Sequence, residues 1–252
     1  MIGIAPEFPT PTRPLDFATL SAERTARGAL PVEKAMARPG ASSYTMSVTW
    51  TPFFTLDLVE RGLLPNGWDL ATSALADAPE RHMIIQGEPS PPYDTPWFFE
   101  NVEGDVLRDR LPWLSVLYHG VLRAFAAGAA GYPLFASNRL RASMTLNILR
   151  GAGGWNDWHT DMTAVTGLLF ATAAGPDGGG DLVFRDGTGR EARLVPRPGL
   201  FVCFEGPIEH QVAPLTTAHP RLSLALLYYR SATDQTGAHD SDVYSLDQPC
   251  QV

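Results

Sequence analysis

The chain has 252 residues, 44% of them hydrophobic and 18% charged, which describes an ordinary globular protein with room for one substantial core. Its formal net charge is −8, and no run of Lys or Arg stands out, which argues against nucleic-acid binding and gives no support for an anionic membrane surface. Two cysteines are too few for a disulfide framework, and no stretch reads as a signal peptide or a membrane span, so we expect a cytoplasmic protein.

The first 133 residues predict mainly helices. Hydrophobic spacing and the placement of Gly and Pro favour helices at Leu15–Arg27, Thr55–Leu63, Trp68–Ala78 and Asp105–Ala130. Pro112 should either kink the last of these helices or start a second one. Ala41–Trp50 is rich in β-forming residues and favours a strand, whereas Glu88–Pro96 is a proline-rich loop. We expect residues 1–133 to support a sheet and not to form a separate domain.

Residues 134–230 have a different character, because short runs of β-forming residues alternate with clusters of Gly, Pro and Asp. This pattern is typical of an all-β barrel or sandwich. The predicted strands are Ser143–Leu149, Val165–Ala171, Asp181–Phe184, Arg193–Val195, Leu200–Phe204, His210–Ala213 and Leu222–Tyr229. The polar tail, residues 231–252, is expected either to be disordered or to fold over the barrel mouth as a lid. We therefore expect residues 1–252 to form one domain.

Three residues in the β-rich part have the chemistry of a metal site. His159 and Asp161 are two residues apart, so in an extended segment both point to the same side. His210 follows forty-nine residues after Asp161, at the start of an apolar strand, and could supply a third ligand. Two imidazoles and one carboxylate form the triad that holds Fe(II) on one face and leaves other positions open. The alternative for a His-x-Asp pair alone is a hydrogen-bonded surface pair.

The same alternation links Arg221 and Ser223, which share one face of the last predicted strand. A charged side chain that points inward from an apolar strand needs a partner, and an anionic ligand would be one. The planar, permanently charged fork of Arg suits a carboxylate, and a nearby hydroxyl adds a directed hydrogen bond. The alternative is a structural salt bridge.

Five short motifs, in this order and spacing, carry a resemblance to a known family. They are H-T-D at His159–Asp161, G-G-G-D-L-V-F at Gly178–Phe184, P-G-L-F-V-C-F at Pro198–Phe204, H-Q-V-A-P-L at His210–Leu215 and R-L-S at Arg221–Ser223. The chain resembles the Fe(II)/2-oxoglutarate-dependent oxygenases, particularly the branch similar to prolyl 4-hydroxylases, over roughly Ser143 to Arg230.

The resemblance implies a mainly β fold with flanking helices, built on a double-stranded β-helix (a jelly roll or cupin-like barrel). It implies that His159, Asp161 and His210 ligate iron, and that Arg221 and Ser223 bind the distal carboxylate of 2-oxoglutarate. The collagen-type enzymes of this branch usually have Lys where Arg221 stands. A tyrosine that often lies about ten residues before the first ligand is absent here, and Asn147 is the predicted replacement among the cosubstrate contacts.

The implied cofactors are Fe(II), 2-oxoglutarate and O2, with ascorbate as a reductant. The implied reaction is hydroxylation of an unactivated C–H bond, with succinate and CO2 as coproducts. Our first hypothesis for the substrate is a small molecule, either a free amino acid or a natural-product intermediate. The alternatives are a prolyl or lysyl hydroxylase that acts on a protein or peptide, desaturation or cyclisation by the same oxidising chemistry, and a non-catalytic cupin-like binding protein.

Residues next to the first histidine are candidates for substrate contacts, because they follow the flexible loop Gly151–Gly154 at the presumed barrel mouth. Two arginines near the same entrance could meet a substrate carboxylate or phosphate. The predicted contacts are Trp155, Asn156, Trp158, Arg150 and Arg141. The alternative is that the tryptophans pack into the rim and that the arginines are solvated.

Overall fold

The computed structural model describes residues 50–78, 82–88, 96–137, 141, 143–173 and 177–232. The helix predicted at Leu15–Arg27, nearly all of the strand predicted at Ala41–Trp50 and the tail beyond residue 232 lie outside the described residues. Within the described ranges, no helix has both the length and the apolar character that crossing a membrane requires.

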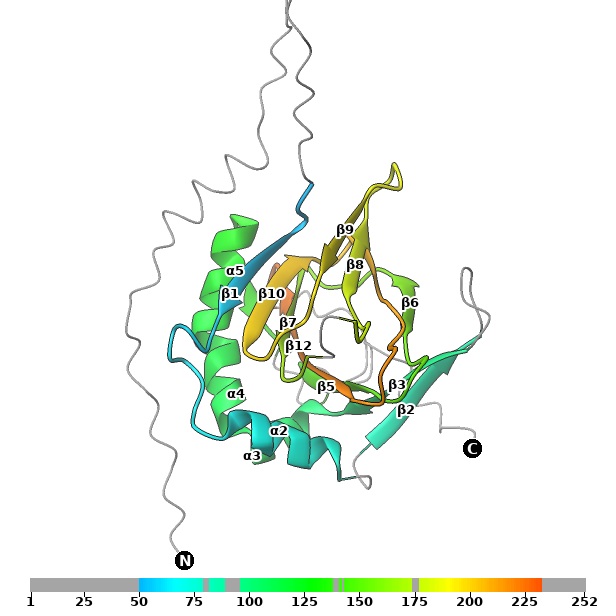
Figure 1. The fold of residues 1–252 in the computed structure, drawn as a ribbon. Coiled ribbons are helices and arrows are strands. Elements are labelled where there is room, and N and C mark those ends of the chain that lie inside the picture. Colours follow the sequence, from blue (N-terminus) through cyan, green and yellow to red (C-terminus); the bar gives the residue numbers. More distant parts are fainter. Residues whose placement is uncertain are drawn as a thin grey trace, which may run out of the picture.

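Two antiparallel sheets face each other across a barrel (Figure 1). The larger sheet has the order β1-β10-β7-β12-β5-β3-β2, with β4 paired to β12. Its strands are β1 (Phe53–Asp57), β2 (His82–Gly87), β3 (Trp97–Val102), β4 (Phe135–Ala136), β5 (Met144–Leu149), β7 (Val165–Phe170), β10 (Leu200–Glu205) and β12 (Arg221–Tyr229). The smaller sheet has the order β6-β11-β8-β9, and its strands are β6 (Asn156–His159), β8 (Leu182–Arg185), β9 (Glu191–Leu194) and β11 (Glu209–Val212).

From β5 onward the chain passes back and forth between the two sheets. The larger sheet takes β5, β7, β10 and β12, and the smaller sheet takes β6, β8, β9 and β11. This alternation of eight strands is the double-stranded β-helix, so the fold expected from the resemblance is confirmed. All seven predicted strands are present, with bounds that shift by one or two residues.

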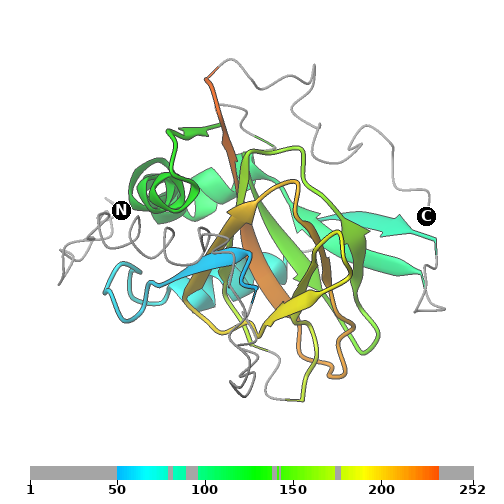
Figure 2. The same cartoon turned by 90° about the horizontal axis from the view of Figure 1, so that it is seen from above.

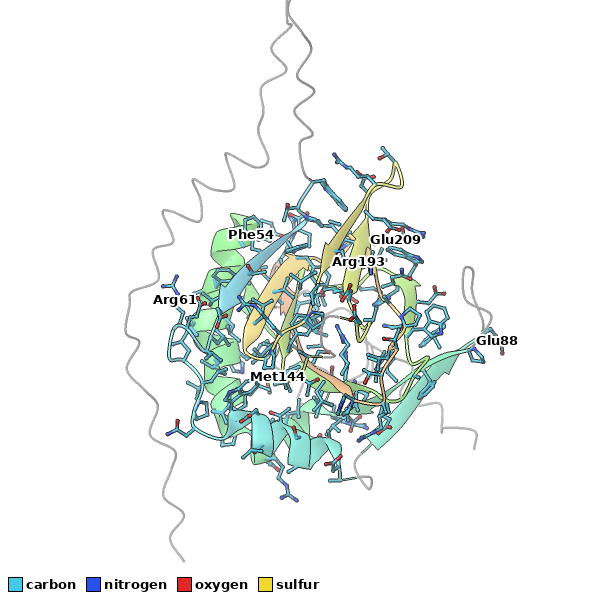
Figure 3. The ribbon with its side chains drawn as sticks, viewed as in Figure 1. Phe54, Arg61, Glu88, Met144, Arg193 and Glu209 are labelled. Carbon is cyan, nitrogen blue, oxygen red and sulfur yellow. The ribbon has the colours of Figure 1, made fainter. Side chains whose placement is uncertain are left out.

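Helices cover the outer face of the larger sheet. They are α2 (Trp68–Ala76), α3 (Gly104–Arg110), α4 (Pro112–Leu117), the π-helical turn η2 (Tyr118–Leu122) and α5 (Arg123–Ala130). Figures 1 and 2 show α4 and α5 against the outside of this sheet, beside β1 and β10. Pro112 is the first residue of α4, so it starts a second helix. In Figure 3, Phe54 lies on the side that faces these helices, whereas Glu209 lies across the barrel.

The central strands of the larger sheet, β5, β7, β10 and β12, are buried on both faces. One apolar cluster, which includes Tyr118, Phe125 and Phe201, lies between this sheet and the helices. Another, which includes Phe184 and Phe204, fills part of the space between the two sheets. Strands buried on both faces need apolar residues at most successive positions, which explains why β7 and β12 are apolar except at Thr166, Arg221 and Ser223.

The helix predicted at Thr55–Leu63 is wrong. Phe53–Asp57 is strand β1, and a turn over residues 58–62 follows it. Every residue of β1 pairs with β10, from Phe53 opposite Phe204 to Asp57 opposite Leu200. The local pattern suits either structure, and the pairing partner, distant in the sequence, decides between them. Sequence reasoning also missed the β2–β3 hairpin, whose strands lie on either side of the proline-rich loop.

Candidate metal and dicarboxylate site

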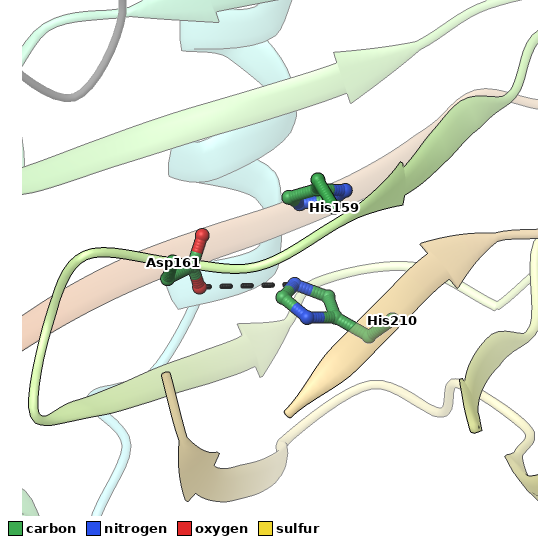
Figure 4. A group of neighbouring side chains, drawn as sticks. All are labelled: His159, Asp161 and His210. Atoms are coloured by element: carbon green, nitrogen blue, oxygen red, sulfur yellow. Dashed lines mark ion pairs between the residues drawn. The ribbon is translucent and has the colours of Figure 1, made fainter. Parts of the chain in front are cut away.

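The three predicted metal ligands converge. One ligand atom from each of His159, Asp161 and His210 can be chosen so that all three lie within 4.8 Å of one another. His159 ends β6, His210 lies directly opposite it on β11, and Asp161 follows in the loop after β6 (Figure 4). The Asp161 N–H donates to the Gly206 carbonyl oxygen at 2.8 Å, which anchors that loop to the turn before β11. Residues 51 positions apart therefore meet because β6 and β11 pair in this register.

Both histidines present the same nitrogen to this centre. His159 Nδ1 lies 2.6 Å from the Asp157 carbonyl oxygen, and His210 Nδ1 lies 2.9 Å from that of Ile208. A carbonyl oxygen can only accept, so each Nδ1 carries the hydrogen and donates it. In the neutral imidazole this tautomer leaves the lone pair on Nε2, the atom through which each ring would bind a metal.

The electrostatics of the centre favour a cation. His210 is buried, and its ring packs against Phe204 and Phe184, with centroids 4.7 and 6.1 Å away. Burial, together with the neighbouring His159, lowers the pKa of His210, so its imidazole is neutral at neutral pH. Asp161 Oδ2 nevertheless lies only 3.7 Å from His210 Nε2. A carboxylate oxygen and an imidazole lone pair that face each other at this distance suit a shared divalent cation.

Arg221 is a buried cation with an unused donor. It is 1% exposed, its Nε donates to the Gly180 carbonyl oxygen at 2.8 Å, and its Nη1 donates to Ser223 Oγ at 3.0 Å. Its Nη2 is buried and has no hydrogen-bond partner among the described residues. Burial lowers the pKa of Arg221 to about 10, and the charge of Asp181 offsets only part of this effect. An unpaired, buried guanidinium N–H is a donor that fits a carboxylate ligand.

Asn147 lies in the same row of the sheet as Ser223, directly opposite it on β5. Its Oδ1 accepts hydrogen bonds from Asn101 Nδ2 at 2.8 Å and from Thr145 Oγ1 at 3.1 Å. Because its oxygen already accepts two hydrogen bonds, the Asn147 side chain would contact a ligand as a donor, through its NH2 group.

One cavity, of about 40 Å³, joins these groups. Its polar wall includes the three metal-ligand candidates, Arg221, Ser223 and Asn147, and its apolar wall includes Leu149, Leu168 and Leu182. The two nitrogen ligands and one oxygen ligand fit Fe(II), and the buried donor of Arg221 fits one carboxylate of a dicarboxylic acid. A larger hollow of about 240 Å³ lies between α5, β1 and β10, but its wall contains none of the predicted site residues.

The predicted substrate contacts separate into two groups. Asn156 lines the cavity. The other four lie elsewhere: Trp155 is fully buried, Trp158 stacks beneath the Arg185 guanidinium at 4.2 Å, Arg141 pairs with Glu103, and Arg150 pairs with Glu100. The side chains of Trp158 and His159 point to opposite faces of β6, because neighbouring residues alternate along a strand.

Sequence reasoning missed polar residues that support the site. Thr166 Oγ1 donates to Asp161 Oδ2 at 2.5 Å, and Asn101 is the buried neighbour of Asn147. Thr166 lies in the apolar strand β7, on the same face as Leu168 and Phe170. The same alternation that marks Arg221 as a polar residue on the inner face of its strand therefore also marks Thr166. Asn101 gave no comparable signal, because its strand was not predicted.

No protein-family model and no curated protein matches this sequence. Solved structures match it by fold. The non-haem α-ketoglutarate-dependent epimerase SnoN from nogalamycin biosynthesis is 16% identical, with a TM-score of 0.56 over 89% of this chain and 92% of its own. A 2OG-Fe(II) oxygenase family oxidoreductase from Burkholderia pseudomallei is 13% identical, with a TM-score of 0.52 over 87% of this chain and 93% of its own.

A prolyl hydroxylase from Trichoplax adhaerens, solved with a hypoxia inducible factor peptide fragment, is 14% identical. Its TM-score is 0.54 over 73% of this chain and 88% of its own. At such identities the likeness shows the architecture. The chain thus has the double-stranded β-helix fold of the Fe(II)/2-oxoglutarate-dependent oxygenases.

Proposed function

We propose that this protein is an Fe(II)- and 2-oxoglutarate-dependent dioxygenase that hydroxylates an unactivated C–H bond of a small molecule, with succinate and CO2 as coproducts. The observation that carries this proposal is one cavity whose wall contains both the candidate metal triad and a donor of Arg221 that has no partner among the residues that the structure describes. A surface His-Asp pair or a structural salt bridge would account for neither feature.

Each polar group of the cavity has a place in this function. His159 and His210 would hold the iron through Nε2, and Asp161 would hold it through its carboxylate. Bound iron supplies the activation of O2 and the oxidation of the substrate C–H bond. Arg221 would bind the distal carboxylate of 2-oxoglutarate with its free Nη2, and the Ser223 hydroxyl lies beside it. The Asn147 NH2 group would donate to another oxygen of the cosubstrate.

The two ends of the cavity differ in exposure, and this difference indicates where each reactant would bind. Arg221 and Ser223 are each 1% exposed, so the cosubstrate would lie at the buried end and be shielded from water. Asp161 is 22% exposed, and His159 is half-buried. O2 and the substrate would therefore enter beside the metal, where Asn156 also lines the wall.

For the substrate class we favour a natural-product intermediate over a free amino acid. Arg141 and Arg150, which could have met a substrate carboxylate, each form an ion pair with a glutamate. The fold likeness to SnoN, from nogalamycin biosynthesis, extends over most of both chains. The likeness to a prolyl hydroxylase keeps a peptide substrate as the second candidate. Desaturation or cyclisation remains the alternative outcome. The cytoplasmic location, the single domain and the absence of nucleic-acid and membrane partners stay predictions.

The test is succinate formation from 2-oxoglutarate under air, with Fe(II) and ascorbate. Uncharged natural products, free amino acids, and proline- or lysine-containing peptides are supplied as three separate panels. We expect succinate above the level of a His210→Ala control, and stimulation by the first panel. Stimulation by peptides alone would replace the small-molecule proposal. Succinate that never exceeds the control level with any panel would refute the dioxygenase.

A further inference from the structure

Asp161 differs from the two histidines in what holds it in place. His159 and His210 lie within paired strands, and each ring is fixed by a hydrogen bond to a carbonyl two residues earlier. Asp161 lies beyond the end of β6, in a loop, and its side chain is 22% exposed. A carboxylate there could rotate about its Cβ–Cγ bond, so a separate interaction must set its direction.

That interaction comes from β7, the strand that follows the loop. Thr166 is 3% exposed, and its hydroxyl donates to Asp161 Oδ2 at 2.5 Å. The same oxygen, Oδ2, faces His210 Nε2 at 3.7 Å. Thr166 thus holds the oxygen that is directed at the second histidine.

A second hydroxyl completes a chain of hydrogen bonds. Thr163 is 7% exposed, and its Oγ1 lies 2.8 Å from Thr166 Oγ1. Thr166 has one hydroxyl hydrogen, and it donates this hydrogen to Asp161. Thr163 must then be the donor toward Thr166. The order of donation is therefore Thr163 to Thr166 to Asp161, and hydrogen bonds in such a chain strengthen one another.

The backbone under this chain is closely packed. A Cβ atom on Gly206 would lie 2.2 Å from the Thr163 carbonyl oxygen and 2.8 Å from that of Asp161. The Asp161 N–H donates to the Gly206 carbonyl oxygen, and the Gly206 N–H donates to that of Ala164 at 3.3 Å. The loop that carries Asp161 and Thr163 is therefore held against the turn after β10, which keeps the two hydroxyls in register with the carboxylate.

We propose that Thr166, supported by Thr163, is a positioning residue that fixes the Asp161 carboxylate as a metal ligand. The proposal rests on the metal site of the proposed function and adds to it the group that orients its one anionic ligand. Hydrogen bonds from neighbouring side chains orient metal-bound carboxylates in proteins generally, and their loss weakens metal binding.

The test is metal binding itself, measured by anaerobic titration of the metal-free full chain with Co(II). The Co(II) visible spectrum is recorded at saturation, because it reports the geometry of the ligands. Thr166→Val removes the hydroxyl at nearly constant shape, and we expect the Co(II) dissociation constant to rise about 10- to 100-fold with an altered spectrum. Thr166→Ser keeps the hydroxyl and should restore the affinity to within about threefold of the original protein.

Thr72→Val is the matched control. Thr72 is also buried, and its hydroxyl also makes one hydrogen bond, to the Trp68 carbonyl oxygen in α2 at 2.8 Å. This variant should leave the Co(II) affinity and the spectrum unchanged. Thermal unfolding of every metal-free variant shows whether it is folded.

Should Thr166→Val fail to fold, Thr163→Val decides the question. It removes only the supporting donor, and we expect the Co(II) dissociation constant to rise several-fold, by about 3- to 10-fold. The positioning role would be overturned if a folded Thr166→Val kept the original Co(II) affinity and spectrum. If Thr166→Val does not fold, the same result in Thr163→Val would overturn it. Either result would leave the proposed function intact. Failure of the unsubstituted protein to bind Co(II) would instead refute the metal site on which both rest.

Discussion

The two ends of the cavity are built in opposite ways. At the metal end, each imidazole already donates from Nδ1 and the carboxylate already accepts from Thr166, so the ligands are oriented in the absence of a metal. At the other end, Arg221 is buried, and one of its donors has no hydrogen-bond partner in the part of the chain that the structure describes. The first end is preorganised, and the second is incomplete until an anion arrives. A preorganised end should bind its metal without rearrangement, whereas the incomplete end should gain stability from its ligand.

The largest expected effect is at the metal end. His210→Ala removes one of the two nitrogen ligands, and we expect Fe(II) or Co(II) binding to weaken by more than about 100-fold and coupled succinate formation to disappear. Anaerobic metal titration measures the first effect, and succinate assay measures the second. His219→Ala, at an exposed loop histidine, is the control and should change neither. Equal losses in both variants would contradict a specific role for His210.

Arg221→Met tests the incomplete end. The substitution keeps an unbranched apolar stem but removes the charged guanidinium group, and we expect the 2-oxoglutarate dissociation constant to rise about 100-fold while metal binding persists. Burial of the cation costs on the order of 3 kcal/mol, judged from its pKa, and loss of its two hydrogen bonds costs a similar amount. The unfolding temperature of the ligand-free variant should therefore change little.

The matched control for this variant is Arg197→Met, because Arg197 is a surface arginine that pairs with Asp57. It should keep the affinity for 2-oxoglutarate. A large fall in the unfolding temperature of ligand-free Arg221→Met, with unchanged 2-oxoglutarate affinity, would assign Arg221 a structural role only.

Gly206→Ala tests whether close packing holds the Asp161 loop. The new Cβ would meet the Thr163 carbonyl oxygen at 2.2 Å, so backbone has to move. We expect the free energy of unfolding to fall by about 1–3 kcal/mol and metal affinity to fall about tenfold. Gly187→Ala is the control, since its Cβ would have no heavy atom within 4 Å. Calorimetric unfolding and metal titration measure both effects, and full metal affinity in Gly206→Ala would show that the loop needs no such packing.

The smallest effect concerns pH. Arg221 has a pKa of about 10 in the folded protein against 12.5 as its ordinary value, so the unfolded chain binds more protons between these values. Its contribution to the free energy of unfolding therefore rises with pH in that window and is constant below it. The carboxylate of 2-oxoglutarate would bind the charged guanidinium of Arg221, so the affinity for 2-oxoglutarate should weaken only as the pH approaches about 10.

Arg221→Lys sharpens this prediction. Lysine has a lower ordinary pKa than arginine, and burial lowers it further, so the loss of 2-oxoglutarate affinity should begin at a lower pH in this variant. Calorimetric titrations of the two proteins over a pH series measure the difference. Superimposable pH profiles would show that residue 221 is not the titrating group.

The sequence predicted the barrel better than the surrounding elements, for a physical reason. Strands such as β10 and β12 are mostly apolar segments bounded by Gly or Pro, and this signal is local. Strand β1 depends on pairing with β10, almost 150 residues away, so its local pattern was misread as a helix. The hairpin β2–β3 was missed because the neighbouring prolines dominate that region.

The same distinction holds within the candidate site. His159 and Asp161 reveal themselves by a spacing of two, and Arg221 does so as a charge within an apolar strand. Alternation along β7 marks Thr166 as a polar residue on the face of Leu168 and Phe170, but only the fold brings its hydroxyl to Asp161. The partners of Arg141 and Arg150 are glutamates 38 and 50 residues away, which no local pattern could pair with them.

The most direct test of the two-ended cavity is anaerobic calorimetric titration of 2-oxoglutarate into the protein with and without one equivalent of Fe(II). If the triad and Arg221 hold the two ends of one ligand, the chain binds one 2-oxoglutarate, at least about tenfold more tightly when iron is present. The same affinity with and without iron, or no binding of iron at all, would contradict the account.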